Sequence, residues 1–195
     1  MSGHNKWSQI KNKKGTADAK RGQLFGKLLK AISIAAKSAP NPQFNPRLRS
    51  AIEQAKKSNV PLENIERAIS KAGEEKNLED VTIEAYGPEG VAMIIEAITD
   101  NTNRTINEIR HILDIQGAKM ANQGSVLWSF EQIADERGPN APACNAMRSI
   151  AGRDSRGNWQ PKFKQPVSQE TTDKISQITE ALEEHDDVQK VITNI

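Results

Sequence analysis

The chain of 195 residues contains one cysteine, few aromatic residues and no long apolar run. A lone Cys144 excludes an intrachain disulfide and a cluster of thiolate metal ligands. Because no stretch of eighteen apolar residues occurs, the sequence predicts no membrane-spanning segment and no membrane partner. The basic N-terminus has no apolar region of the kind that secretion signals carry, so we expect a cytoplasmic protein. The mitochondrial matrix is the alternative, although the sequence shows no presequence.

The patterns of catalysis and of cofactor binding are also missing. The three histidines, His4, His111 and His185, are far apart in the sequence and have no ligand spacing around them. There is no Walker-type phosphate loop, and no Ser-His-Asp or Cys-His arrangement can be argued. The acidic run 183–187 lacks the alternating ligands and glycine turn of a calcium loop, and we interpret it as a solvated helix end. We therefore expect no enzyme activity, no metal and no cofactor.

Positive charge, by contrast, is abundant and unevenly distributed. Residues 1–73 hold fifteen Lys and Arg against four Asp and Glu, whereas residues 74–195 hold twelve against twenty-one. The first thirty residues alone hold eight basic residues and one acidic residue, Asp18. A basic surface attracts phosphate backbones and gains affinity by releasing counterions. The first part of the chain is therefore predicted to bind a polyanion.

This basic part is predicted to form three helices. Apolar residues recur at helical spacing from Leu24 to Ala36, and the first helix should run from about residue 17 to 39, where prolines end it. Asn45 is a good N-cap before Pro46 for a second helix that ends near residue 57. A third helix opens at residue 61 and stops at Gly73, a plausible C-cap.

The acidic part shows a different period. Strands are expected at 82–86 (a short edge strand), 91–98 (buried), 126–130, 162–167 and 188–192, a turn at 87–90, and helices after a Thr105/Glu108 capping box and at 170–184. The order strand, helix, strand, strand, helix, strand is the ferredoxin-like pattern. The predicted fold class is therefore α+β. A basic three-helix domain (1–73) and a linker (74–80) precede a ferredoxin-like α/β domain (81–131 and 162–195), which a loop (132–161) interrupts.

Several short motifs occur in a fixed order: GHNKW at 3–7, DAKRG at 18–22, NPRLR at 45–49, YGPEG at 86–90, TDNTNRT at 99–105 and GSV at 124–126. Together they closely resemble the YebC family, which includes the mitochondrial translational activator of cytochrome c oxidase. The resemblance covers residues 1 to about 131 and resumes from about 162, with DDVQ at 186–189.

The resemblance implies a helical first domain, an α/β second domain built from two chain segments, and a third domain inserted between those segments. Residues 132–161 occupy the place of the third domain and are too short and loop-like to form it. Either this chain lacks the domain, or its gene model has lost or replaced an exon.

Family members are described as DNA-binding transcriptional regulators and as factors that act on translating ribosomes. We expect a non-enzymatic regulator that docks on ribosomal RNA and activates translation. A DNA-binding transcriptional regulator is the first alternative, and an adaptor whose basic surface binds an acidic protein is the second. The expected nucleic-acid contacts are Lys6, Trp7, Lys11, Lys13, Lys14, Lys20, Arg21, Lys27, Lys30, Arg47, Arg49 and Arg104.

Two of these assignments have competing structural interpretations. Trp7 either packs its own terminus against the helices, which we favour, or stacks on a base. The stretch 100–105 is explained by turn and capping chemistry, but a helix N-terminus with Arg104 beside it also suits an anion.

Overall fold

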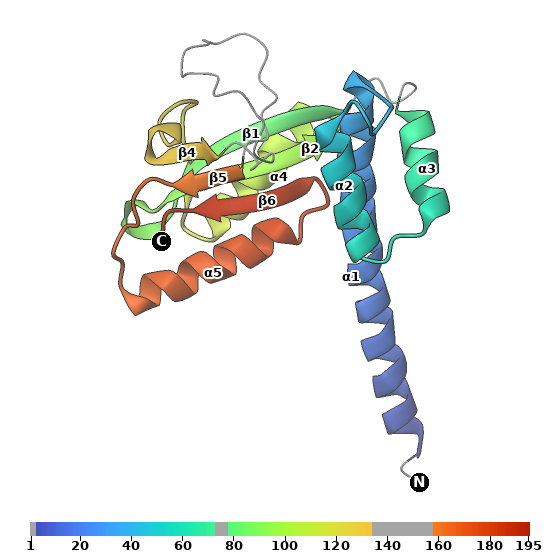
Figure 1. Ribbon diagram of the computed structural model, residues 1–195. Coiled ribbons are helices and arrows are strands. Elements are labelled where there is room, and N and C mark those ends of the chain that lie inside the picture. The colour runs from blue at the N-terminus through green and yellow to red at the C-terminus, as the bar shows by residue number, and fades with distance from the viewer. Residues whose placement is uncertain (1–2, 73–77, 134–157) are drawn as a thin grey trace. The chain divides into compact units, whose positions relative to one another are not determined.

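The computed structural model describes residues 3–72, 78–133 and 158–195, with the backbone only for residues 3–17, 133 and 158. The chain forms two compact units that divide between Leu78 and Glu79 (Figure 1). Helices alone build the core of the first unit, and a sheet covered by helices builds that of the second. The α+β class is therefore confirmed. None of the described helices is long and apolar enough to cross a membrane.

The first unit consists of the three predicted helices, α1 (Gly3–Ser38), α2 (Pro46–Lys57) and α3 (Leu62–Lys71). Helices α2 and α3 both pack on the second half of α1, because that half carries the apolar stripe. The buried side chains that meet there include Leu28, Ile32, Ala35, Leu48, Ala55 and Ile65. The C-cap predicted at Gly73 lies outside the described residues.

Helix α1 begins at Gly3, so the predicted start near Ala17 was wrong. The apolar stripe that marked the helix in the sequence begins only at Leu24. The preceding residues are rich in Lys, which favours helices, and contain no proline, so the backbone is helical although the sequence has no apolar stripe there.

Asn45 joins the end of α1 to the start of α2, and its predicted role as N-cap is confirmed. Its side-chain oxygen accepts the Leu48 N–H at 3.0 Å. Its side-chain nitrogen donates to the carbonyl groups of Ala35, at 2.7 Å, and Ala39, at 2.8 Å. One buried amide thus satisfies orphan backbone groups at the ends of two helices.

A four-stranded antiparallel sheet of spatial order β3-β1-β2-β6 forms the second unit. Its strands are β1 (Glu79–Tyr86), β2 (Ala92–Thr99), β3 (Lys119–Met120) and β6 (Val188–Thr193). Helices α4 (Thr102–Ile115) and α5 (Gln169–Glu183) cover one face, over a core that contains Met93, Ile95, Ile109 and Ile178. Because β6 pairs with β2, two separated chain segments build one sheet, as predicted (Figure 1).

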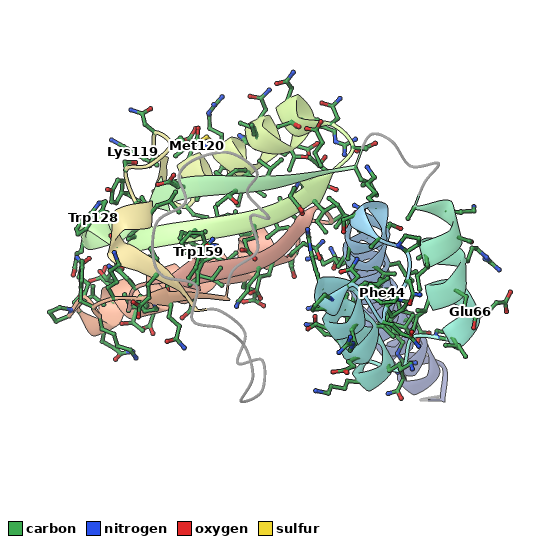
Figure 2. All side chains as sticks on the ribbon, turned by 45° about the horizontal axis from the view of Figure 1, so that its top comes forward. Phe44, Glu66, Lys119, Met120, Trp128 and Trp159 are labelled. Carbon is green, nitrogen blue, oxygen red and sulfur yellow. The ribbon has the colours of Figure 1, made fainter. Side chains whose placement is uncertain are left out.

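A smaller sheet lies over part of the opposite face. Strands β4 (Phe130–Ile133) and β5 (Asn158–Pro161) pair with each other, and the 3-10 turn η2 (Leu127–Ser129) precedes β4. Phe130 is buried against Ile94, and the half-buried Trp159 packs on the same cluster (Figure 2). Both ends of the predicted loop 132–161 are therefore strand residues.

The predicted strands 126–130 and 162–167 were wrong: neither segment belongs to the main sheet, whose strands are β3, β1, β2 and β6. The N–H groups of Val126 and Leu127 donate to the Glu84 carboxylate instead of to a neighbouring strand. Prolines at 161 and 166 have no N–H to offer a sheet. Strand β1 is also longer than predicted, and its last two residues pair with β3, so it is not an edge strand there.

The capping box predicted at Thr105 and Glu108 was wrong as well. Helix α4 starts earlier, and its N-cap is Asn101, whose side chain accepts the Arg104 N–H at 3.2 Å. Thr105 is buried inside the helix and uses its hydroxyl for tertiary contacts. The turn after β1 (η1, Pro88–Gly90), α5 and β6 are confirmed.

Candidate nucleic-acid interface

Helix α1 carries most of the predicted nucleic-acid contacts. Those on the part described as backbone only are Lys6, Trp7, Lys11, Lys13 and Lys14. Further along, Lys20 and Arg21 are exposed, and Lys27 and Lys30 are half-buried. The spacing of positions 20, 27 and 30 places these lysines on the side of the helix away from Ile32 and the core.

Helix α2 adds Arg47, which is half-buried, and the exposed Arg49 in its first turn. The Arg49 guanidinium already donates to the carbonyl oxygens of Pro42, at 3.3 Å, and Gln43, at 3.0 Å. These bonds hold the connection between α1 and α2 in place. An incoming phosphate would therefore share Arg49 with two carbonyl groups.

A groove between α1 and α3 adds two cations that the sequence did not single out, Arg67 and Lys71. Lys30 and Ser33 line it from α1, and Asn64, Arg67 and Lys71 from α3. The Ser33 hydroxyl donates to the Ala68 carbonyl at 3.3 Å and so ties the two helices together at the floor. Positions 67 and 71 are one helical turn apart, which is the signal that could have identified them.

One cation of the groove has an acidic partner on its own helix. Arg67 forms an ion pair with Glu63 one turn earlier, at 2.8 Å, with both side chains largely exposed. An exposed pair of this kind contributes little and is screened by salt, so a phosphate can compete for the guanidinium. The groove thus brings three cations, Lys30, Arg67 and Lys71, together between two packed helices.

Arg104 belongs to the second unit and has two acidic partners there. Its guanidinium lies 3.1 Å from the buried Asp187 carboxylate and 2.8 Å from the exposed Asp100 carboxylate. The hydrogen bonds to Asp187, and then those to Asp100, raise the pKa of Arg104 above its ordinary value. An anion at the start of α4 would compete with two carboxylates. The nucleic-acid contact at Arg104 stays a prediction, and the two partners favour a structural role for this residue instead.

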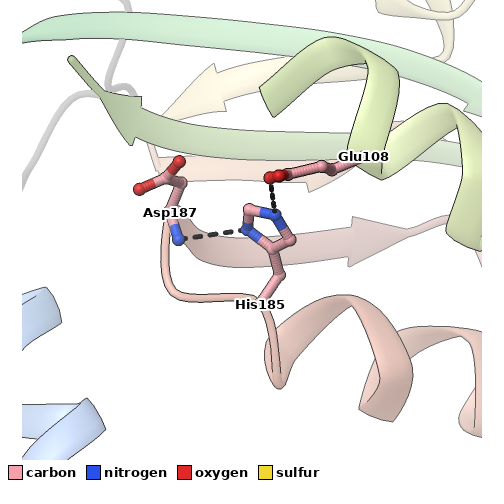
Figure 3. Close-up of side chains that lie close together, drawn as sticks. All are labelled: Glu108, His185 and Asp187. Carbon is pink, nitrogen blue, oxygen red and sulfur yellow. Dashed lines mark hydrogen bonds and ion pairs between the residues drawn. The ribbon is translucent and has the colours of Figure 1, made fainter. Parts of the chain in front are cut away.

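The same network includes three potential metal ligands, Glu108, His185 and Asp187, whose ligand atoms lie within 4.8 Å of one another (Figure 3). His185 Nδ1 accepts the Asp187 N–H at 3.1 Å, and Nε2 lies 2.8 Å from the Glu108 carboxylate. Asp187 also accepts the Thr105 hydroxyl at 2.7 Å. The potential ligand atoms thus form hydrogen bonds within the protein. These bonds hold the turn between α5 and β6 against α4.

This cluster corrects part of the interpretation of residues 183–187: α5 ends at Glu183 as expected, and Glu183, Glu184 and Asp186 are exposed, but His185 and Asp187 are not solvated charges. Asp187 is only 3% exposed, and its carboxylate binds Arg104 and Thr105. The pairing joins residues more than eighty positions apart, which no local sequence pattern signals.

A second buried carboxylate, that of Glu84 in β1, holds the GSV loop. It accepts the N–H groups of Gly124 at 2.5 Å, Val126 at 2.6 Å and Leu127 at 3.1 Å. Gly124 has a φ of +88°, a conformation that favours glycine. The loop is therefore fixed by hydrogen bonds from its N–H groups to the Glu84 carboxylate rather than by pairing with a neighbouring strand.

Comparison with known proteins relates both units to one family. Residues 5–75 match the model of the TACO1/YebC protein N-terminal domain, and residues 78–135 and 145–195 match that of the TACO1/YebC second and third domain. The crystal structure of a conserved hypothetical protein from Aquifex aeolicus superimposes with a TM-score of 0.74 at 35% identity. It covers 91% of this chain and 90% of that one.

Similar curated proteins are named probable transcriptional regulatory proteins. One from Finegoldia magna is 49% identical over 136 residues, which are 68% of this chain and 56% of the relative, so the match spans about half the relative's length. One from Solibacter usitatus is 36% identical over 235 positions, covering all of this chain and 95% of the relative. That alignment has about forty positions more than this chain has residues. With two family models matched along most of its length, the chain belongs to the TACO1/YebC family.

Proposed function

We propose that this protein is a non-enzymatic regulator of gene expression that binds nucleic acid through its first unit. The curated relatives are named regulatory proteins, which supports the general role. The observation that carries the binding proposal is the basic three-helix unit, with fifteen Lys and Arg against four acidic residues in residues 1–73. Lys and Arg contact phosphates without reading the base sequence, so this surface supplies affinity rather than specificity.

The partner that we favour is ribosomal RNA, and the proposed role is that of a translational activator in the cytoplasm. Cations on α1 and along the α1–α3 groove would meet the phosphate backbone of a folded RNA. The second unit, whose loops are held by buried carboxylates, would lie against another surface of the ribosome. Support for RNA comes from the family resemblance to a translational activator.

DNA is the second candidate partner, and the names of the curated relatives favour it. A DNA-binding regulator would use the same cations, since backbone contacts do not distinguish the two nucleic acids. The two candidates therefore differ in the site of action rather than in the docking surface.

Salt titration of binding tests the electrostatic mechanism. The logarithm of the affinity for labelled RNA and DNA should fall linearly with the logarithm of the salt concentration, by roughly 0.7–0.9 per phosphate neutralised. Absence of binding to both nucleic acids at low salt would reject the proposal. Binding to an acidic protein in their place would support the adaptor alternative.

Sedimentation of tagged protein through a sucrose gradient, with and without ribonuclease, distinguishes RNA from DNA. Co-migration with ribosomal particles that ribonuclease abolishes is the result expected for a translational activator. Absence from those fractions, together with recovery of specific promoter fragments, would assign the protein to transcription.

A charge-reversal variant of α1 tests whether this helix contacts the phosphate backbone. Joint change of Lys11, Lys13, Lys14 and Lys20 to Glu should weaken binding to all sequences alike, with the thermal unfolding midpoint little changed. A loss restricted to some sequences would contradict backbone docking.

A further inference from the structure

Two aromatic side chains lie exposed and in contact on the second unit. Trp128 in η2 is 59% exposed, and Phe163, just after β5, is 47% exposed. Their ring centroids are 5.6 Å apart, with an angle of 39° between the planes. Trp128 is labelled in Figure 2 on the segment that leads into β4. Large aromatic side chains left in water at one place commonly mark a binding surface.

A hydrogen bond to the preceding loop fixes the orientation of the Trp128 side chain. Its Nε1–H donates to the Ser125 carbonyl at 2.7 Å, and the Tyr86 hydroxyl donates to the same oxygen at 2.6 Å. The Glu84 carboxylate holds the following residues of the loop through their N–H groups. With its one polar atom turned inward, the indole offers solvent only its apolar rings. A stacking partner would thus meet a ring that is already ordered.

The two chain segments that carry the pair differ in charge from the second unit as a whole. Residues 74–195 carry twenty-one acidic residues against twelve basic ones. Over 119–133 and 158–168, however, the charged side chains are Lys119, Lys162, Lys164 and Glu131. All three lysines are exposed, and Lys119 pairs across the sheet with Tyr86, whose hydroxyl binds the loop below Trp128. Exposed aromatic side chains on segments with an excess of basic residues are the combination that proteins use for single-stranded nucleic acid.

We propose that Trp128 and Phe163 form a stacking site for an unpaired nucleobase, with Lys119, Lys162 and Lys164 contacting the adjacent phosphates. This inference rests on the proposed function and makes it more specific, because a paired base inside a duplex is not available to stack. The first unit then supplies backbone affinity, and the aromatic pair selects single-stranded or looped segments. The cations favour this occupant over an apolar protein surface, against which three lysines would lose their hydration.

Fluorescence anisotropy of the full chain with a labelled single-stranded RNA and with a duplex of equal length tests the site. Trp128→Leu keeps apolar bulk but has no aromatic face, and it should weaken single-strand binding by roughly tenfold. Duplex binding should stay within about twofold of the wild type, since phosphate contacts remain. Trp128→Phe also loses the bond to Ser125 but keeps an aromatic ring, and it should retain most of the affinity. Ile115→Ala removes another exposed apolar side chain of the same unit and should change neither affinity.

The possible results of this experiment distinguish failure of the stacking site from failure of the proposed nucleic-acid binding. If Trp128→Leu leaves single-strand binding unchanged, or weakens single strand and duplex equally, the stacking site is wrong while nucleic-acid binding stands. If Trp128→Phe is as weak as Trp128→Leu, the loss comes from the Ser125 bond, and the stacking proposal is again overturned. If the wild type binds neither RNA nor DNA at low salt, the proposed function itself fails. A wild-type dimer that Trp128→Leu dissociates in sedimentation would place a second copy on the pair and reject the nucleobase.

Discussion

The Glu89 carboxylate, in the turn between β1 and β2, accepts a 2.8 Å hydrogen bond from the hydroxyl of Ser168, the N-cap of α5. It also accepts the Thr171 hydroxyl at 2.8 Å, so an acidic side chain lies at the positive end of the helix. Glu89 holds a φ of +55°, a conformation uncommon for a residue with a side chain. The contact joins the two chain segments that flank residues 134–157.

This contact predicts acid-dependent stability. The hydrogen bonds from the Thr171 hydroxyl, and then from Ser168, lower the pKa of Glu89 from its ordinary 4.5. A lowered pKa means that the stabilisation is complete above pH 4.5 and disappears as the pH falls through the lower folded value. Glu89→Gln should therefore lower the thermal unfolding midpoint at pH 7, and the difference from wild type should vanish in acid. An equal difference at both pH values would show that the ionised carboxylate is not responsible.

The Glu84 clamp on the GSV loop predicts a larger effect on stability. Glu84→Gln replaces an acceptor oxygen by an N–H donor against three buried or half-buried N–H groups, and it should lower the free energy of unfolding by about 2–3 kcal/mol. Urea unfolding measures this. Glu131→Gln removes an exposed carboxylate from β4 and should stay within about 0.5 kcal/mol of wild type. Similar values for the two variants would contradict a structural role for the clamp.

The role of Arg104 can be separated from that of its network. Arg104→Gln removes the charge, whereas Thr105→Val breaks bonds to Asp187 and Thr99 in the same cluster without changing charge. Thr105→Val should cost about 1–2 kcal/mol of unfolding free energy and leave RNA affinity unchanged. Because two carboxylates already compensate Arg104, we expect Arg104→Gln to lower stability and leave the salt dependence of binding unaltered. A shallower salt dependence for Arg104→Gln alone would instead assign the guanidinium to a phosphate.

The α1–α3 groove predicts a site-dependent change in the electrostatics of binding. Joint Arg67→Gln and Lys71→Gln substitution should reduce the slope of log affinity against log salt by roughly 0.7–0.9 for each phosphate that the groove no longer neutralises. Joint Lys56→Gln and Lys57→Gln substitution removes the same charge from the last turn of α2 and should change the slope less. Equal changes would mean that only the total charge of the unit matters, with no preferred path along the groove.

Local patterns in the sequence determined the helices of the first unit, the β1–β2 turn, α5 and β6. Apolar spacing marked α1, and the N-cap Asn45 before Pro46 marked the start of α2. The start of α1 was misplaced because its basic first half has no apolar stripe to mark a helix. The sequence likewise indicated the family, and its basic first part indicated a polyanion as partner.

Only the tertiary structure decided where the loops and polar side chains lie. The sequence predicted a strand at 126–130, but a carboxylate forty positions earlier binds the N–H groups that a strand would have used. Arg104 contacts Asp187, which lies 83 positions later in the chain. Trp128 and Phe163 are in contact although residues 134–157 separate them in the sequence. Such contacts depend on how strands pair and helices dock, and their partners lie too far apart in the chain for propensity or spacing to indicate them.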